Sequence, residues 1–252
     1  MGLCFALTSV CCNFAAYLEY RQGAPLSVLS RKDMNTKDFK RAALFDLDGV
    51  LVDTEPQYTA FWKEIGREFF PTDPDFAESL KGHTLTHIYN THFADNAEAR
   101  ELVRQRLEDF EAQMRYPLMP GCMEYVSTLR EKGWGLAVVT SSDRVKMECF
   151  YRSHPDFSQQ FHHILTAEDV EHSKPAPDGY VKAARSFGLA PEACVVFEDS
   201  LNGLRAGRAS GAKLVGLTTS LPAEEIAPLC DVVVNDYENL SQLNIEELWQ
   251  DI

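Results

Sequence analysis

The stretch AALFDLDGVLVDTEP, residues 42–56, constrains the fold of this chain more than any other. Its apolar residues 42–45 predict a buried strand of a parallel sheet, because a strand covered on both faces is apolar throughout. Asp46 and Asp48 follow directly, and Gly49 lets the backbone leave the strand in a tight turn. Open α/β sheets bind ligands just beyond the carboxyl ends of their strands. The sequence therefore predicts that these two carboxylates face a ligand site.

The Asp48 side chain can be oriented in two ways. If the strand continues past Asp46, residues two apart point the same way and both carboxylates face one pocket. If the chain turns after Asp46, the Asp48 side chain swings over the first acid instead. Either arrangement brings like charges together, which is costly unless a cation or a shared proton offsets the repulsion. A lone D-x-D-G would also fit a solvated turn between a strand and a helix.

The charge and the cysteines of the chain limit its partners and its compartment. The 252 residues carry a formal net charge of −14, which repels phosphate backbones and anionic lipids, so neither nucleic acid nor a membrane is expected as a partner. An anionic small substrate requires a metal ion and local cations at the site. The seven cysteines include no C-x-x-C pair. They are typical of reduced thiols, and a cytoplasmic location follows.

Residues 1–40 carry no clear structural pattern. The apolar segment 3–18 has the length of a signal-peptide core, but it lacks a basic leading region and a small-residue cleavage site. It is also too short and too interrupted by polar residues for a membrane span. Met34 lies just upstream of the first strand. We therefore expect residues 1–40 to be an N-terminal extension and residues 1–33 to be dispensable for folding.

Residues 56–116 show helical periodicity and no strand signal. Pro56 suits the first turn of a helix, with Asp53 or Thr54 as its cap. Apolar residues then recur on one helical face at Tyr58, Phe61, Trp62, Ile65 and Phe69. The sequence PTDPD at 71–75 ends this helix, and two further helical patterns follow. Residues 56–116 are thus predicted to be an all-helical insertion.

From residue 117 onward, strands and helices alternate. Strands are predicted at 135–140, 162–166, 194–197, 214–217 and 232–234, and helices near 122–131, 144–152, 178–187 and 200–209. This alternation is typical of a parallel sheet with crossover helices. The predicted fold class is α/β, with a Rossmann-like core built from residues 41–55 and 117–252.

Polar residues follow several of these strands. Because the carboxyl ends of parallel strands share one edge, we expect one cluster of residues to converge there: Asp46, Asp48, Thr140, Lys174 and the pair Glu198-Asp199. Carboxylate oxygens of this kind are the ligands that Mg²⁺ prefers. Lys174, held between prolines in SKPAPD, supplies a cation that offsets the acids.

Two further features suit a phosphate group. Thr140 and Ser141 precede a predicted helix, and a hydroxyl with backbone N–H groups at a helix start can bind an anion, although TSSD is equally typical of a plain helix cap. Phosphoryl transfer also needs a nucleophile and a proton donor. Asp46 is the candidate nucleophile, and Asp48 the candidate acid and base.

The motifs DLDGVLVDT, Thr140, SKPAPD and FED occur in the order that is typical of the haloacid dehalogenase-like hydrolases, and the chain resembles that superfamily. The resemblance implies a Rossmann-like core with a C1-type helical cap at residues 56–116. It assigns to Asp46 and Asp48 the roles given above. It implies a metal held by Asp46, the backbone carbonyl of Asp48 and Asp199, with Glu198 binding directly or through water.

Within the superfamily, the runs DGVLVDTE, LKGHT and FEDSLNG resemble the β-phosphoglucomutase and sugar-phosphate phosphatase branch. Two departures favour a phosphatase over a mutase. No arginine follows Lys81-Gly82, where the mutases bind a second phosphate, and Tyr58 replaces a histidine of their first cap helix. Lys81, His83 and Thr84 are the cap residues expected to contact the substrate. Hinges near residues 54–56 and 117–120 would let the cap close.

The resulting prediction is a monomeric, Mg²⁺-dependent phosphatase of small phosphorylated metabolites, with sugar or polyol phosphates favoured. The alternative is a β-phosphoglucomutase-like sugar-phosphate mutase. Dehalogenation is disfavoured, because dehalogenases of the superfamily lack the acid supplied here by Asp48. A non-catalytic ligand-binding protein of the same fold is disfavoured by the intact motifs.

Overall fold

The computed structural model describes residues 39–81 and 85–250. Its centre is a sheet of six parallel strands in the order β3-β2-β1-β4-β5-β6. The strands are β1 (Ala42–Phe45), β2 (Gly135–Val139), β3 (His163–Leu165), β4 (Cys194–Glu198), β5 (Lys213–Leu217) and β6 (Val232–Val234). Each lies within one residue of the range predicted from its apolar run, so the predicted α/β fold with a parallel sheet is confirmed.

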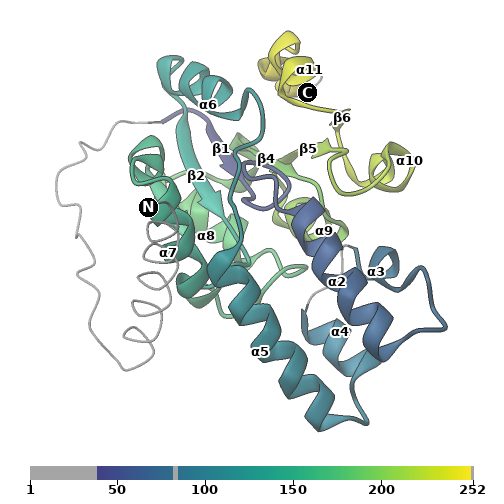
Figure 1. Ribbon diagram of the computed structural model, residues 1–252. Helices are drawn as coiled ribbons and strands as arrows, with labels where there is room; N and C mark the ends of the chain where they lie inside the picture. Colours follow the sequence, from purple (N-terminus) through teal and green to yellow (C-terminus); the bar gives the residue numbers. More distant parts are fainter. Residues whose placement is uncertain (1–38, 82–84, 251–252) are drawn as a thin grey trace.

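Helices cover both faces of the sheet and extend beyond one end of it (Figure 1). The α-helices are α2 (Glu55–Phe69), α3 (Phe76–Ser79), α4 (Leu85–His92), α5 (Ala97–Gln113), α6 (Cys122–Glu131), α7 (Arg144–Ser153), α8 (Asp178–Ser186), α9 (Leu201–Ser210), α10 (Ala223–Ile226) and α11 (Tyr237–Gln242). Short 3₁₀ helices occupy Phe157–Gln160, Ala167–Asp169, Pro191–Ala193, Ala227–Leu229 and Ile245–Trp249. The sequence pattern did not indicate α3, α10 and α11, which are too short to show a helical period.

The central strand β1 buries both of its faces. Ala43 and Phe45 point into a cluster formed with α6, α7 and α11, and Ala42 and Leu44 point into a second cluster formed with α8 and α9. All four side chains are fully buried. Phe45 also stacks on Phe197 of β4, with 4.5 Å between the ring centroids. Burial on both sides explains why the strand is apolar throughout, since each large apolar side chain contributes about 1.5–3 kcal/mol.

The strand order creates a switch point between β1 and β4. The chain passes from β1 outward to β2 and β3, and then returns to place β4 on the other side of β1. Crossovers on the two sides therefore leave the sheet in opposite directions, and a crevice opens at the carboxyl ends of β1 and β4. Ligands of doubly wound sheets bind in this crevice.

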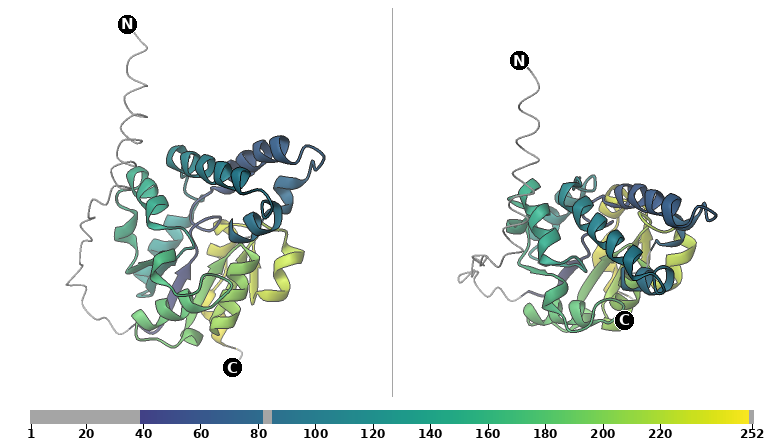
Figure 2. Two further views of the ribbon diagram at one scale, coloured as in Figure 1. Left: turned by 90° about the horizontal axis from the view of Figure 1, so that it is seen from below. Right: turned by 60° about the horizontal axis from the view of Figure 1, so that its bottom comes forward.

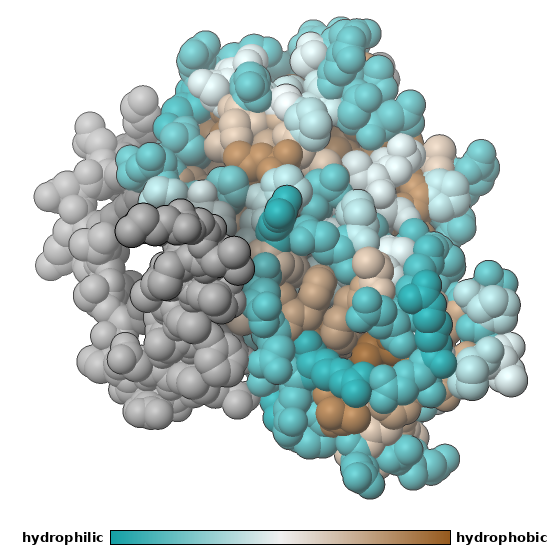
Figure 3. All heavy atoms as spheres, viewed as in Figure 1, coloured by the Kyte–Doolittle hydropathy of each residue, from teal (hydrophilic) through white to brown (hydrophobic). Residues whose placement is uncertain are grey.

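Helices α2–α5 lie together at one side of the sheet and have a hydrophobic cluster of their own (Figures 1 and 2). Phe61 and Ile65 of α2 pack in this cluster with Phe76 of α3 and Leu107 of α5. Hydrophobic surface is visible between these helices among hydrophilic side chains (Figure 3). We interpret the four helices as an inserted cap, because they occupy the connection from β1 to β2 and form a separate core.

The chain enters and leaves this cap through adjacent segments. Val52 and Leu118 form an antiparallel bridge. Asp53 N donates to Pro117 O at 2.8 Å, and Met119 N donates to Leu51 O at 2.9 Å. The two hinges expected from the sequence lie next to this bridge.

Two local predictions have clear outcomes. Pro56 lies in the first turn of α2, as predicted, but the predicted side-chain cap is wrong. Thr54 occupies the cap position in a helical backbone conformation and makes no capping hydrogen bond, and its hydroxyl donates to Asp48. None of the helices within residues 39–81 and 85–250 is long and apolar enough to cross a membrane.

Candidate active site

Three buried carboxylates meet at the switch point. Asp46 follows β1, Glu198 ends β4 and Asp199 comes next, and an oxygen of each lies within 4.8 Å of the others. The register explains this convergence, because Phe45 and Phe197 are paired across the two strands and the residues after them lie side by side. The exposed fractions are 8%, 0% and 2%, respectively. Three of the four acids expected at this edge of the sheet therefore converge, and Asp48 is not among them.

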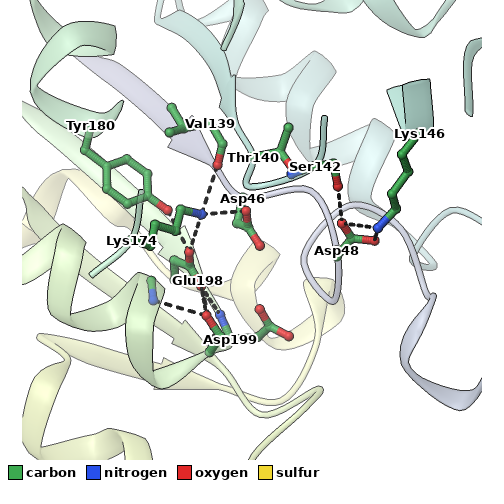
Figure 4. A network of polar contacts seen from close by, with 12 residues as sticks. Asp46, Asp48, Val139, Thr140, Ser142, Lys146, Lys174, Tyr180, Glu198 and Asp199 are labelled. Carbon is green, nitrogen blue, oxygen red and sulfur yellow. Dashed lines mark hydrogen bonds and ion pairs between the residues drawn. The ribbon is translucent and has the colours of Figure 1, made fainter. Parts of the chain in front are cut away.

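Lys174 joins two of the acids. Its Nζ donates to Asp46 Oδ1 and Glu198 Oε1 at 2.6 Å each, and to the backbone oxygen of Val139 at 3.0 Å (Figure 4). Its side chain is 9% exposed. Burial lowers the pKa of Lys174, but Asp46 and Glu198 outweigh it and hold the pKa above its ordinary value. The lysine is thus a fixed cation between the two acids.

The Glu198 carboxylate is surrounded by donors. Oε1 accepts from Lys174 and from Tyr180 Oη at 2.8 Å. Oε2 accepts from the backbone N–H groups of Asp199 and Ser200 at 3.0 and 3.2 Å, and from Ser200 Oγ at 3.1 Å. An ionised carboxylate has about four lone-pair sites, so these bonds saturate it. Glu198 thereby fixes the position of Lys174, and its predicted metal contact stays a prediction.

Asp199 carries an oxygen that lacks a partner. Its Oδ2 accepts from Ser220 Oγ. Thr219 Oγ1 lies 3.5 Å from the same oxygen and donates to Gly49 O at 2.6 Å. Oδ1 is buried and makes no hydrogen bond with the described residues. An unpaired buried carboxylate oxygen is costly. Burial, followed by the charges of Glu198 and Asp46, raises the pKa of Asp199 well above its ordinary value.

The charges of this cluster fit a divalent cation. Three carboxylates face one ammonium group, Lys174, which leaves two negative charges in excess. Burial, and then the charge of Glu198, raises the pKa of Asp46 to about 7 although Lys174 opposes the shift. A cation next to Asp46 and the free oxygen of Asp199 would relieve both the repulsion and the unmet hydrogen-bonding capacity. The donor set, all oxygen, is suited to a hard ion.

Asp48 points away from the other acids (Figure 4). The chain turns directly after β1, where the N–H groups of residues 50–52 donate to Leu47 O, so the extended alternative is wrong. The expectation that the turn swings Asp48 over Asp46 is also wrong, because the turn directs the Asp48 carboxylate toward Lys146. The Asp48 carboxylate accepts from Lys146 Nζ at 2.9 Å on both oxygens, from Thr54 Oγ1 at 2.8 Å and from Ser142 Oγ at 2.9 Å. Burial raises the pKa of Asp48, but Lys146 outweighs it and holds the pKa below its ordinary value.

Thr140 and Ser141 lie at the end of β2, facing the cavity. Thr140 Oγ1 accepts from the backbone N–H of Ser142 at 3.0 Å, which leaves its own hydroxyl hydrogen free to donate. The N-terminus of α7 already binds a carboxylate of the protein, because Asp143 caps this helix and accepts from Lys146 N at 2.8 Å. The predicted anion site therefore depends on the hydroxyl groups more than on the helix terminus.

A cavity of about 520 Å³ lies between these residues and the cap. It is lined on the sheet side by Asp46, Lys174 and Asp199, and Lys81 contributes from the cap. Lys81 Nζ lies 2.8 Å from Glu78 Oε2 and 3.9 Å from Glu55 Oε1. The predicted substrate contacts His83 and Thr84 fall outside the described residues.

Several polar residues of the site were not predicted from the sequence. Thr219 and Ser220 follow β5, and the same edge rule that located Thr140 would have found them. Lys146 and Tyr180 left no such signal. Each lies inside a helix, where a lysine is usually solvated and a tyrosine usually belongs to the core.

Gly203 supports the Glu198 position, and we expect Gly203→Ala to damage the site. A Cβ at Gly203 would lie 1.7 Å from Glu198 Oε1, so the carboxylate must move and Lys174 moves with it. Alanine itself favours a helix such as α9, so any loss comes from the clash. We expect a loss of about 1–3 kcal/mol in the free energy of unfolding, and a fall in catalytic rate measured on the folded fraction.

Gly188→Ala is the matched control. Gly188 has φ of 70°, and no atom lies within 4 Å of the position that a Cβ would take. Alanine there costs about 1–2 kcal/mol of backbone strain without touching the site. Stability should fall while the rate per folded molecule stays unchanged. Equal rates in the two variants would contradict the supporting role of Gly203.

The chain is similar in sequence to known hydrolases and mutases. The model of the haloacid dehalogenase-like hydrolases matches residues 40–211. A validoxylamine A 7'-phosphate phosphatase of Streptomyces hygroscopicus subsp. limoneus is 32% identical over 203 residues, covering 78% of this chain and 93% of that protein. A β-phosphoglucomutase of Mycobacterium bovis is 30% identical over 243 residues, covering 79% of this chain and 91% of that protein.

A solved structure shares the fold. The crystal structure of a family IA haloacid dehalogenase hydrolase from Entamoeba histolytica superimposes with a TM-score of 0.69 at 21% identity, covering 82% of this chain and 97% of that one. The family model covers the two strands that carry the acids and the loop that carries Lys174. This chain belongs to the haloacid dehalogenase-like hydrolase family, in the branch that contains the β-phosphoglucomutases and sugar-phosphate phosphatases.

Proposed function

We propose that the protein is a Mg²⁺-dependent phosphatase of small phosphorylated metabolites, with sugar or polyol phosphates as substrates. One observation supports this most strongly: Asp46 lies between a fixed cation, Lys174, and the partner-free oxygen of Asp199, at the wall of a cavity. That arrangement offers a nucleophile together with positions for positive charge on either side of a phosphate.

Asp46 and Asp48 have different roles in the proposed reaction. An Asp46 oxygen attacks phosphorus, a new O–P bond forms, and the bond from phosphorus to the leaving alcohol breaks. Asp48 gives a proton to the leaving oxygen. In the second half, Asp48 takes a proton from water, the water oxygen attacks phosphorus, and the aspartyl-phosphate returns to Asp46 and free phosphate. Lys174 keeps a positive charge next to the phosphoryl group throughout.

Asp48 has to move before it can act as an acid. In the structure it is bound by Lys146, Thr54 and Ser142, with its pKa below the ordinary value. Turning toward Asp46 breaks the contact with Lys146 and removes the cause of the low pKa, which favours protonation. Cap closure over a bound substrate is the natural trigger, since Thr54 directly precedes α2.

The residues that would hold Mg²⁺ are Asp46, Asp199 and the backbone carbonyl of Asp48, with Glu198 next to them. When bound, the ion neutralises charge on the phosphoryl group. The function is tested with p-nitrophenyl phosphate: hydrolysis should require Mg²⁺, stop with EDTA and resume with excess Mg²⁺. Hydrolysis that is unaffected by chelation, or no hydrolysis at all, would overturn the proposal.

Mg²⁺ should stabilise the folded protein more at pH 8 than at pH 5.5. The pKa of Asp46 is raised to about 7 when no metal is present, so folding is penalised as pH rises from the ordinary value of 3.8 through 7. Mg²⁺ relieves that penalty above pH 7, whereas below it the ion must displace a proton. Thermal unfolding with and without Mg²⁺ measures the difference. An equal or larger rise in Tm at pH 5.5 would contradict it.

A mutase is the alternative function, and the similarity to the β-phosphoglucomutase of M. bovis is the observation that favours it. Incubation with glucose 1-phosphate and a trace of glucose 1,6-bisphosphate separates the two. Free phosphate indicates the phosphatase, and glucose 6-phosphate indicates the mutase. The predicted substrate contacts of the cap, at Lys81, His83 and Thr84, are part of the proposed phosphatase function.

The proposed setting is a monomer in the cytoplasm. Cys122, Cys149, Cys194 and Cys230 are free thiols, and buried free thiols are typical of proteins from reducing compartments. Size-exclusion chromatography tests the oligomeric state.

A further inference from the structure

The cap side of the cavity has a chemical character of its own. Glu55, Tyr58 and Trp62 of α2 line it, and their spacing of three and four residues places them on one face of the helix. Glu111 of α5 lines the same region, and Tyr58 Oη donates to Glu111 Oε1 at 2.7 Å. We call these four residues the distal subsite, because they face the part of a substrate that leaves after phosphoryl transfer.

The distal subsite is negatively charged. Glu55 and Glu111 contribute two carboxylates. Lys81, the neighbouring cation, is shared between Glu78 at 2.8 Å and Glu55 at 3.9 Å. Lys146 lies 4.9 Å from the centre of the Tyr58 ring, and both oxygens of Asp48 bind its ammonium group. When Asp48 turns toward Asp46, the charge of Lys146 still faces Glu111, and the carboxylate of Glu55 remains in excess. The local field thus repels a second anionic group.

Lys174, the third lysine that lines the cavity, lies at the phosphoryl site. Lys174 is bound by Asp46 and Glu198. Among the residues that the structure describes, no arginine lines the cavity. A bisphosphate or a phosphorylated sugar acid would therefore place its second anion against two carboxylates, without a bidentate cationic partner.

The uncharged surface of the subsite suits the carbon skeleton of a sugar or cyclitol. The Tyr58 ring gives an apolar surface, and the buried side chains of Trp62, Leu80 and Ile88 contribute small apolar areas to the same wall. Carboxylates accept hydrogen bonds from hydroxyl groups and pair with ammonium groups, which also bind aromatic faces.

Resting on the phosphatase function proposed above, we infer that the distal subsite selects phosphomonoesters with a single anionic group. The leaving alcohol carries hydroxyl or amino groups, and Glu111 is the residue that rejects a second phosphate or a carboxylate.

Four compounds on one hexose scaffold test this inference by competition with p-nitrophenyl phosphate at pH 8, in Mg²⁺. Glucose 6-phosphate and glucosamine 6-phosphate should bind at least about tenfold more tightly than 6-phosphogluconate and glucose 1,6-bisphosphate, a difference of roughly 1.4 kcal/mol. Apparent affinity is read from inhibition, so the result does not depend on which compounds are turned over. Equal or tighter binding of the two anionic compounds overturns the inference, as does failure of all four to compete.

Glu111→Gln identifies the residue responsible. Glutamine keeps the acceptor for Tyr58 and removes the charge, so the preference for glucose 6-phosphate over glucose 1,6-bisphosphate should shrink severalfold. Asp109→Asn is the matched control, because it removes one exposed charge from the same helix outside the cavity and should leave the preference unchanged. An equal change in both variants, or none in Glu111→Gln, counts against the role of Glu111. If the unaltered protein does not hydrolyse p-nitrophenyl phosphate at all, that result contradicts the phosphatase function instead.

Discussion

Replacing Asp46 with asparagine is expected to lower kcat/KM for p-nitrophenyl phosphate by at least about 10⁴-fold, the scale of loss when a catalytic nucleophile is removed. An amide cannot form the acyl-phosphate that the proposed reaction requires. The fold should tolerate the change, because Asp46 is one of three buried acids that repel each other and raise the pKa of Asp46 to about 7. The measurement pairs steady-state kinetics with urea unfolding.

A stable but inactive Asp46→Asn protein supports the assignment. Activity within tenfold of the unaltered protein would remove Asp46 as the nucleophile. A large loss of stability would show that Asp46 mainly holds Lys174 in place, and would leave the kinetic result without mechanistic meaning.

Replacing Lys174 with methionine, unlike Asp46→Asn, should lower the stability of the fold, and it should also lower activity. The lysine is the shared partner of Asp46 and Glu198, and both acids stay buried without it. Removing one partner of a buried ion pair costs about 3–5 kcal/mol, and the loss of a fixed charge at the phosphoryl group costs about 10²–10³-fold in rate. Urea unfolding and steady-state kinetics measure the two effects.

Two companion variants make this result interpretable. Lys182→Met removes an exposed lysine from α8 and should change neither quantity appreciably. The double variant Asp46→Asn with Lys174→Met should recover part of the lost stability, because one of the unpaired acids is gone, while activity stays absent. Additive losses of stability in the double variant would mean that the ion pair contributes little to folding.

The core of the fold and most of its acids could be predicted from the sequence. Strands buried on both faces are apolar throughout, so their limits are visible as apolar runs, and parallel pairing then requires the residues after them to share an edge. This reasoning brings Asp46, Lys174 and Asp199 together without any knowledge of side-chain geometry. Applied to the strand at 214–217, it would also have found Ser220.

The remaining features depend on side-chain geometry that periodicity does not record. Whether Asp48 faces Asp46 or Lys146 is decided by the turn in which residues 50–52 bond to Leu47. The contact of Lys146 with Asp48 joins residues 98 positions apart, through a lysine whose sequence context is that of a solvated helix residue. Tyr180 is fully buried and packs like any core aromatic, and only the position of its hydroxyl shows that it binds Glu198.

The antiparallel bridge between Val52 and Leu118 has a consequence for how such enzymes diversify. The backbone segments that enter and leave the cap contact each other at this bridge. The helical segment between them can therefore be exchanged for another of different length and shape while its two ends keep their positions. New specificity can then arise by recombination at this junction, and the strands that hold Asp46 and Asp199 keep their register.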